Sequence, residues 1–199
     1  MAQPVVYYVR HGETDWNVAG RLQGRHDIPL NANGRAQAAR CGHILSGLFA
    51  GDRLAATDFD YVSSPLGRAS QTMELLRTAL GLGATGYRTD ERLVEIAFGD
   101  WEGFTIAQLH SSDPQRIAAR EQDKWSFVPP NGESYKMVAA RMGEWYRSLV
   151  RDCVVTAHGG TARGLIAYLG IAHAAAAPLI DIAQGIVYVF KDGQMSRFT

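Results

Sequence analysis

Short apolar runs, each too brief to form a helix, alternate along this chain with longer segments of helical periodicity. Runs of this kind occupy residues 5–9, 59–63 and 152–157, and their length and β-branched or aromatic content are typical of buried strands. The segments between them repeat apolar residues at helical spacing, over about 32–48, 67–80, 133–150 and 160–169. Strands that alternate with helices form a layered α/β domain around a largely parallel sheet. The order of these segments therefore predicts an α/β fold.

The end of the chain departs from this alternation. Residues 186–190 and 195–198 are both strand-like, and the turn residues Asp192 and Gly193 lie between them. Such a hairpin forms an antiparallel edge, so we expect a mixed sheet that is mostly parallel.

An irregular segment rich in tryptophan and phenylalanine separates the second and third predicted strands. It covers about residues 100–132, with short helical pieces expected near Thr105 and Pro114. The length of the chain suits one well-buried domain, so we expect residues 1–199 to form a single domain in which this segment is a cap over the strand ends. Four aromatic residues of the segment are expected mainly in the core, with one or two lining the pocket below: Trp101, Phe104, Trp125 and Phe127.

Charge and cysteine content argue against several classes of protein. Twenty basic residues balance twenty acidic ones, so net charge favours neither nucleic acid nor an anionic membrane surface as a partner. Cys41 and Cys153 show no metal-ligand spacing and no disulfide framework. The sequence shows no signal peptide and no membrane-spanning run. We therefore expect a cytoplasmic protein that binds anions through local clusters of basic residues.

The most informative polar residues follow directly on two of the predicted strands. The first strand runs into Arg10 and His11, and the third runs into His158 and Gly159. Ligands of open α/β sheets bind beyond the carboxyl ends of the strands. Both imidazoles can therefore share one pocket, where the glycine after each histidine lets backbone N–H groups approach an oxyanion.

A third strand end adds positive charge to the same edge. The second strand ends near Ser64, and Arg68 falls in the first turn of the helix that follows. Both the guanidinium and the helix N-terminus favour a bound anion. The other histidines follow no strand end beside a basic residue and are interpreted as surface or satisfied side chains: His26, His43, His110 and His173.

Residues 10–17 resemble the signature of the histidine phosphatase superfamily, which includes cofactor-dependent phosphoglycerate mutase. Four further segments are similar, in the same order, to the family's substrate loop and to the segments with its second arginine, its catalytic acid and its second histidine: 22–24, 63–72, 93–103 and 156–160. Ordered motifs at compatible spacing are specific, and they cover nearly the whole chain. The resemblance implies a three-layer α/β/α fold of the phosphoglycerate mutase type, with a mostly parallel mixed sheet.

The resemblance also implies roles for the matched residues. His11 would attack the phosphoryl group, and Glu95 would protonate the leaving alkoxide and then activate water. The phosphoryl oxygens would contact the polar and cationic residues of the site: Arg10, Arg68, His158, Asn17 and Gly159. The substrate would also contact Gln23, Gly24 and Thr14. No cofactor and no metal are expected, because arginines and imidazoles already supply positive charge.

Three carboxylates have alternative interpretations. Without the motif, Glu95 would be assigned to an ordinary ion pair with Arg92 or Arg88. Glu13 lies inside the signature and faces an electropositive site, so we expect it to pair with Arg10 or Arg68. Glu102 is expected to be structural. The neutral tautomer of His11 requires its second ring nitrogen to donate to a backbone carbonyl.

Three functions fit these residues: a phosphatase, a mutase that returns the phosphoryl group to its substrate, and a non-catalytic phosphate-binding protein. The last is disfavoured, because every residue that the chemistry requires is present. Family mutases have a longer segment between the acid and the second histidine, and a C-terminal tail that closes the site against water. The short segment from Glu95 to His158 and the end of the chain at Thr199 therefore favour the phosphatase.

The sequence leaves the physiological substrate and the oligomeric state open. The expected substrate is a small phosphorylated metabolite and the expected product is inorganic phosphate. Sugar phosphates, phosphoglycerates, nucleoside monophosphates and the phosphorylated ribazole of cobalamin synthesis all fit. Gln184 and Gly185 depart from the asparagine-containing pattern of many relatives, so substrate preference is not transferred.

Overall fold

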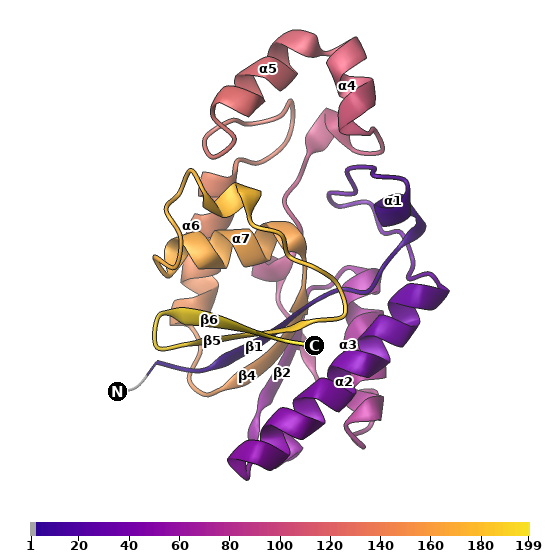
Figure 1. The fold of residues 1–199 in the computed structure, drawn as a ribbon, viewed down its shortest axis with the longest axis vertical. Helices are drawn as coiled ribbons and strands as arrows, with labels where there is room; N and C mark the ends of the chain where they lie inside the picture. The colour runs from indigo at the N-terminus through magenta and orange to yellow at the C-terminus, as the bar shows by residue number, and fades with distance from the viewer. Residues whose placement is uncertain (1–2) are drawn as a thin grey trace.

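A six-stranded mixed sheet runs through the middle of the molecule in the computed structural model, which describes residues 3–199 (Figure 1). Its strand order is β3-β2-β4-β1-β5-β6. The strands are β1 (Val6–Arg10), β2 (Asp60–Ser63), β3 (Arg88–Thr89), β4 (Cys153–Ala157), β5 (Val187–Lys191) and β6 (Gln194–Phe198). β1, β2, β3 and β4 pair in parallel, and β5 runs antiparallel to both β1 and β6. The predicted mixed, mostly parallel sheet is thus confirmed.

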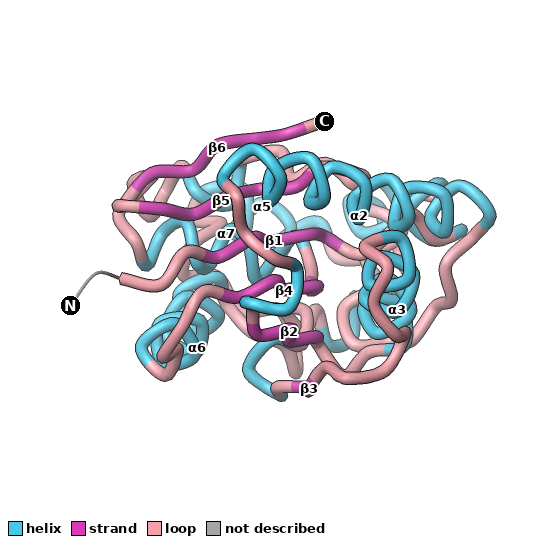
Figure 2. Tube along the Cα trace, turned by 90° about the horizontal axis from the view of Figure 1, so that it is seen from below, coloured by secondary structure: helices cyan, strands magenta, loops and turns pink. Residues whose placement is uncertain are grey.

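Helices cover both faces of this sheet. They are α1 (Asp15–Val18), α2 (Ala32–Asp52), α3 (Gly67–Ala79), α4 (Ile106–Ser112), α5 (Pro114–Gln122), α6 (Tyr135–Arg147) and α7 (Gly159–Tyr168). α2 and α3 pack on one face, and α6 and α7 pack on the other (Figures 1 and 2). The three layers agree with the expected fold.

The alternation of side chains along β1 explains why both faces need a helical layer. Val6 and Tyr8 pack with α6 and α7, whereas Tyr7 and Val9 pack with α2 and α3. All four side chains are buried, because successive residues of a strand point to opposite faces. A strand with two apolar faces is stable only between two layers.

The predicted helix boundaries are close to the observed ones, with two informative differences. Asn31 caps α2 as predicted, since its side chain accepts from the Gly34 N–H at 2.8 Å, but the helix continues to Asp52 and ends at Arg53, which has a φ of 58°. Neither α1 nor β3 was predicted. Four residues and two residues respectively are too few to show a periodicity.

The helices α4 and α5, which fall within the segment expected to form a cap, project away from the sheet (Figure 1). They have a small apolar centre of their own, which contains Trp101, Leu109 and Ile117. Within the described range, none of the helices has the length and apolarity needed to span a membrane.

Candidate active site

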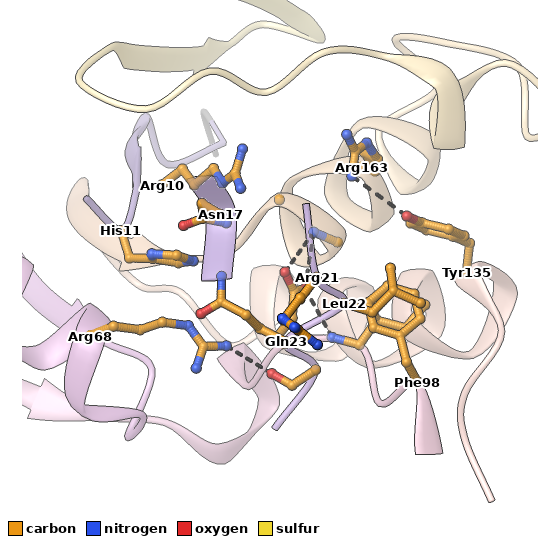
Figure 3. Close-up of a pocket in the computed structure, with 15 residues that line it drawn as sticks. Arg10, His11, Asn17, Arg21, Leu22, Gln23, Arg68, Phe98, Tyr135 and Arg163 are labelled. Carbon is orange, nitrogen blue, oxygen red and sulfur yellow. Dashed lines mark hydrogen bonds between the residues drawn. The ribbon is translucent and has the colours of Figure 1, made fainter. Parts of the chain in front are cut away.

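Residues from three strand ends meet in a cavity of about 150 Å³ at the carboxyl edge of the sheet (Figure 3). The sequence-predicted residues that line it are Arg10, His11, Asn17, Gln23, Gly24, Arg68, Glu95 and Gly159. His158 is not in the wall itself. Its ring is fully buried beside the cavity, with its centroid 5.2 Å from that of His11. Thr14 was also predicted in the site, but it does not line the cavity.

His11 is held as a neutral imidazole with a defined tautomer. Its Nδ1 lies 2.7 Å from the Gly12 carbonyl oxygen, and a carbonyl can only accept, so Nδ1 carries the proton. Burial lowers the pKa of His11 well below its ordinary value, and the charges of Arg10 and Arg68 lower it further. Nε2 therefore keeps its lone pair at neutral pH, as a nucleophile requires.

The chain at His11 is fixed by close backbone contacts. The His11 N–H donates to the Ala157 carbonyl at 2.9 Å, which extends the pairing of β1 and β4. A Cβ on Gly12 would lie 2.1 Å from the Gly34 carbonyl oxygen at the start of α2. Only glycine permits this approach. The contact sets the packing of the start of α2 against the loop that carries His11.

Three buried nitrogens of the site have no hydrogen-bond partner among the described residues: Arg10 Nε, Arg68 Nε and His158 Nδ1. Burial lowers the pKa of both arginines, and the same effect lowers the pKa of His158 well below its usual value. A buried donor without an acceptor costs roughly 1–3 kcal/mol. Three such nitrogens together indicate a site shaped for a ligand with several acceptor oxygens.

Ser64 explains the orientation of His158. Its Oγ lies 2.8 Å from His158 Nε2, while the Leu66 N–H approaches the same oxygen at 3.4 Å. A hydroxyl that accepts from Leu66 can still donate its own proton to Nε2. In that tautomer of the neutral His158 ring, the proton lies on Nδ1, the unpartnered nitrogen.

Glu95 is anchored by backbone amides and forms no ion pair with the side chains of residues 3–199. Its Oε1 accepts from the Ile96 N–H and from the Gly160 N–H, both at 2.9 Å. A Cβ on Gly160 would lie 2.3 Å from this oxygen, so the approach depends on glycine. The alternative of a pair with Arg92 is wrong, because Arg92 binds Asp90 at 2.6 Å.

Thr14 is buried, and its side chain serves the site indirectly. Its hydroxyl lies 3.0 Å from Gln23 Oε1, and it accepts from the Asn17 N–H as the cap of α1. The expected direct contact of Thr14 with substrate is therefore replaced by positioning of Gln23 and Asn17. Gln184, at the departure from the family pattern, donates to Asn17 Oδ1 at 2.9 Å.

Arg68 connects the cavity to the loop of residues 24–27. Its two terminal nitrogens donate to the carbonyls of His26 and Gly24, at 2.5 and 2.7 Å. Asp27 from the same loop accepts from the Gly67 N–H at 2.9 Å, at the start of α3. The guanidinium is thus oriented by backbone oxygens, which leaves Nε for a ligand.

Two expectations about the surroundings are wrong. Glu13 pairs with neither Arg10 nor Arg68, since its carboxylate accepts from the Asn31 side chain at 2.9 Å, and Asn31 and Asn33 lower the pKa of Glu13. One or two of Trp101, Phe104, Trp125 and Phe127 were expected to line the pocket, and none of the four does. The apolar wall consists instead of Leu22, Ile96, Phe98 and Tyr135. Glu102 is structural as expected and accepts from the Phe98 N–H at 3.0 Å.

The wall also contains cationic residues that sequence reasoning missed, Arg21 and Arg163. Arg163 lies one turn along α7 from Gly159 and Gly160, on the same helix face. Helical spacing from His158 could have identified it. Within residues 3–199, histidine, cysteine and acidic side chains do not gather in groups of three that could bind a metal.

The sequence of the chain was compared with protein families and with individual proteins. The profile of the histidine phosphatase superfamily (branch 1) matches residues 6–194. A glucosyl-3-phosphoglycerate phosphatase of Mycobacterium tuberculosis is 38% identical over 175 residues, which cover 81% of this chain and 73% of the relative. A 2,3-bisphosphoglycerate-dependent phosphoglycerate mutase of Gloeobacter violaceus is 30% identical over 166 residues, covering 79% of this chain and 72% of the relative.

Solved structures show the same fold. A putative alpha-ribazole-5'-P phosphatase from Escherichia coli aligns with a TM-score of 0.81 at 25% identity, over 98% of this chain and 94% of the other. The mycobacterial glucosyl-3-phosphoglycerate phosphatase complexed with VO3 aligns with a TM-score of 0.78 at 32% identity, over 99% of this chain and 97% of the other.

Proposed function

This chain belongs to the histidine phosphatase superfamily, and from that premise we propose that it hydrolyses small phosphate monoesters through a phosphohistidine on His11. The observation that carries the proposal is the neutral, tautomer-fixed His11 beside three unpartnered buried nitrogens. The phosphatase names of similar proteins support the same activity.

The first step transfers the phosphoryl group to the enzyme. His11 Nε2 attacks phosphorus, the bond from phosphorus to the ester oxygen breaks, and the departing alkoxide takes a proton from Glu95. Arg10, Arg68 and His158 donate to the phosphoryl oxygens, where negative charge is spread in the transition state. Their donors are already oriented, so little reorganisation is needed during the reaction.

The second step returns His11 to its starting state. A water molecule attacks the phosphorus of the phosphohistidine, the bond from phosphorus to Nε2 breaks, and Glu95 takes the proton of that water. Inorganic phosphate is released. The anchoring of Glu95 by the amides of Ile96 and Gly160 supports one carboxylate in both roles.

The proposal includes independence of metals and cofactors. Two guanidinium groups supply the charge that a divalent ion supplies in other phosphatases. We also propose a cytoplasmic location with small phosphorylated metabolites as substrates, which the two free, buried cysteines support.

The short cap favours hydrolysis over phosphoryl isomerisation. Only a 3₁₀ turn (Gly99–Trp101), α4, α5 and their loops lie between Glu95 and α6, and a mutase must keep water from its phosphohistidine. The mutase names of some relatives make isomerisation the second candidate.

A substrate screen tests the proposal. Purified protein is offered a panel of phosphomonoesters and 4-nitrophenyl phosphate, and released phosphate is measured. In parallel, 3-phosphoglycerate is incubated with a trace of 2,3-bisphosphoglycerate, and the 2-phosphoglycerate formed is measured. Phosphate release without isomerisation is expected. Faster isomerisation than hydrolysis would identify a mutase.

A further inference from the structure

Glu95 lies in a segment that belongs to neither a helix nor a strand. The segment covers residues 94–98, between two short 3₁₀ turns. Leu93, just before it, and Ile96, within it, are almost fully buried and anchor it in the core. Apolar contacts have no preferred direction, so they do not fix where the Glu95 carboxylate points. That direction depends on polar contacts with other parts of the chain.

Glu133 forms two hydrogen bonds with Ala97 in this segment. The Ala97 N–H donates to Glu133 Oε2 at 2.9 Å, and the Glu133 N–H donates to the Ala97 carbonyl at 2.8 Å. Hydrogen bonds to an ionised acceptor are roughly twice as strong as neutral ones. Because α6 begins at Tyr135, these bonds connect the start of that helix to the chain two residues after Glu95.

Arg141 lies about two turns along α6 and contacts both Glu133 and the other side of the segment. Its Nε and Nη2 donate to the two oxygens of the Glu133 carboxylate, at 3.3 and 3.2 Å. Its remaining nitrogen, Nη1, donates to the Arg92 carbonyl at 2.7 Å. The Glu133–Arg141 pair therefore holds the chain both before and after Glu95.

Both members of the Glu133–Arg141 pair are charged and largely shielded from solvent. The exposed fractions of the two side chains are 14% and 16%. Burial raises the pKa of Glu133, but the charge and hydrogen bonds of Arg141 outweigh burial, and the pKa is lowered. Arg25 adds a longer contact with Glu133, at 3.4 Å, from a half-exposed position. A guanidinium that binds a carboxylate through two N–H groups has a defined geometry, so the pair is a rigid support.

The carboxylate of Glu95 spans two elements, which makes the position of its segment important. Glu95 Oε1 accepts from the Gly160 N–H at the start of α7, whereas the segment itself is held from α6. Neither Glu133 nor Arg141 lines the cavity. A shift of the segment relative to α7 would displace the acid from the ester oxygen, and a displacement of about 1 Å can slow a reaction by about 10²-fold.

We propose that Glu133 and Arg141 are positioning residues for the catalytic acid. They hold the chain on both sides of Glu95 so that its carboxylate remains at the ester oxygen of the leaving group. This inference rests on the proposed function, because it takes Glu95 as the proton donor. It assigns two residues outside the cavity to the step in which the bond from phosphorus to the ester oxygen breaks.

The leaving group of the substrate separates this role from a general contribution to stability. kcat/KM is measured on the best alkyl ester of the substrate screen and on 4-nitrophenyl phosphate, and the alkyl value is divided by the aryl value. An alkoxide needs a proton to depart and an aryl oxide does not, so a displaced acid lowers this ratio. A loss of folded protein lowers both values equally and leaves the ratio unchanged.

The variants are Arg141→Met, Arg141→Lys and the control Arg147→Met. Arg147 is an exposed arginine of the same helix that donates to the Tyr168 hydroxyl, so its removal changes the charge of α6 equally. Arg141→Met should lower the ratio by about tenfold, and Arg147→Met should keep the wild-type ratio. Arg141→Lys should lower it by about threefold, because an ammonium group cannot reproduce the planar fork.

A double variant tests whether Arg141 acts through Glu95. Glu95→Gln alone should lower the ratio. Adding Arg141→Met to Glu95→Gln should lower it no further, because two changes that act through one group are not additive.

An unchanged ratio in Arg141→Met would overturn the proposal, as would a further fall of the ratio in the double variant. If circular dichroism shows that Arg141→Met does not fold, an unchanged ratio in Arg141→Lys overturns it instead. Failure of the proposed function gives a different result: no ester is hydrolysed, or Glu95→Gln keeps the wild-type ratio. A lowered ratio in Glu95→Gln beside a normal one in Arg141→Met refutes only the positioning role.

Discussion

His11 is neutral because burial and the charges of Arg10 and Arg68 lower its pKa. The proposed mechanism therefore depends on this one side chain. Replacement of His11 by alanine removes the proposed nucleophile and should lower turnover by about 10³-fold or more. The measurement is kcat on the best substrate, with circular dichroism to show that the fold is kept. His43→Ala, at an exposed position on α2, is the matched control. Residual activity above a few per cent would refute the phosphohistidine route.

Glu95 can be tested through the chemistry of the leaving group. Glu95→Gln should slow a sugar phosphate by about 10²–10⁴-fold in kcat/KM and 4-nitrophenyl phosphate far less, because an aryl oxide departs without a proton. This ratio reports the steps up to loss of the alcohol, so water activation in the second step leaves it unchanged. Equal losses on both esters would mean that Glu95 only positions other groups.

Individual site residues were predictable where a motif or a strand end marked them. Arg10 and His11 lie at the end of β1, and His158 follows the end of β4. Because β1 and β4 pair in parallel, their ends lie side by side and bring these residues together. Thr14 and Glu13 were misassigned because sequence proximity to a catalytic residue does not determine where a side chain points. The use of Thr14 as a cap of α1 could not be predicted, since a helix of four residues has no detectable period.

At the scale of elements, the start of α3 depends on a residue from a distant loop. The helix has no side-chain cap of its own, and Asp27 accepts from the Gly67 N–H instead. Asp27→Ala should cost about 1 kcal/mol, which lowers Tm by about 2–4 °C. Asp27→Asn keeps an acceptor oxygen and should melt close to the wild type in thermal unfolding. Identical melting of all three proteins would exclude the capping role.

The elements themselves were largely predictable, since long periodic segments and buried strands leave clear patterns. The apolar wall was not. Leu22, Ile96 and Phe98 come from irregular segments, whose course depends on contacts such as that of Phe98 N–H with Glu102 rather than on any period. This is why the fold could be predicted better than the substrate.

For the whole molecule, the source of the positive charge that binds phosphate predicts how activity responds to chelators. All phosphate-binding charge in the proposed mechanism comes from side chains, so exhaustive treatment with EDTA followed by dialysis should leave kcat unchanged. The assay compares treated and untreated protein on the same ester. Activity that is lost and then restored by Mg²⁺ or Zn²⁺ would show that a metal takes part.

The position of β1 in the sheet has a consequence for the order of events during synthesis. β1 precedes the other strands in the chain, yet both of its neighbours, β4 and β5, begin after residue 150. While the ribosome makes the intervening residues, the apolar strand that leads to His11 lacks its sheet partners, and unpaired strand edges promote aggregation. The same delay means that His11 meets His158 only when translation is nearly finished. A nascent chain that stops before β4 therefore contains His11 but lacks the strands and the second histidine that complete its pocket.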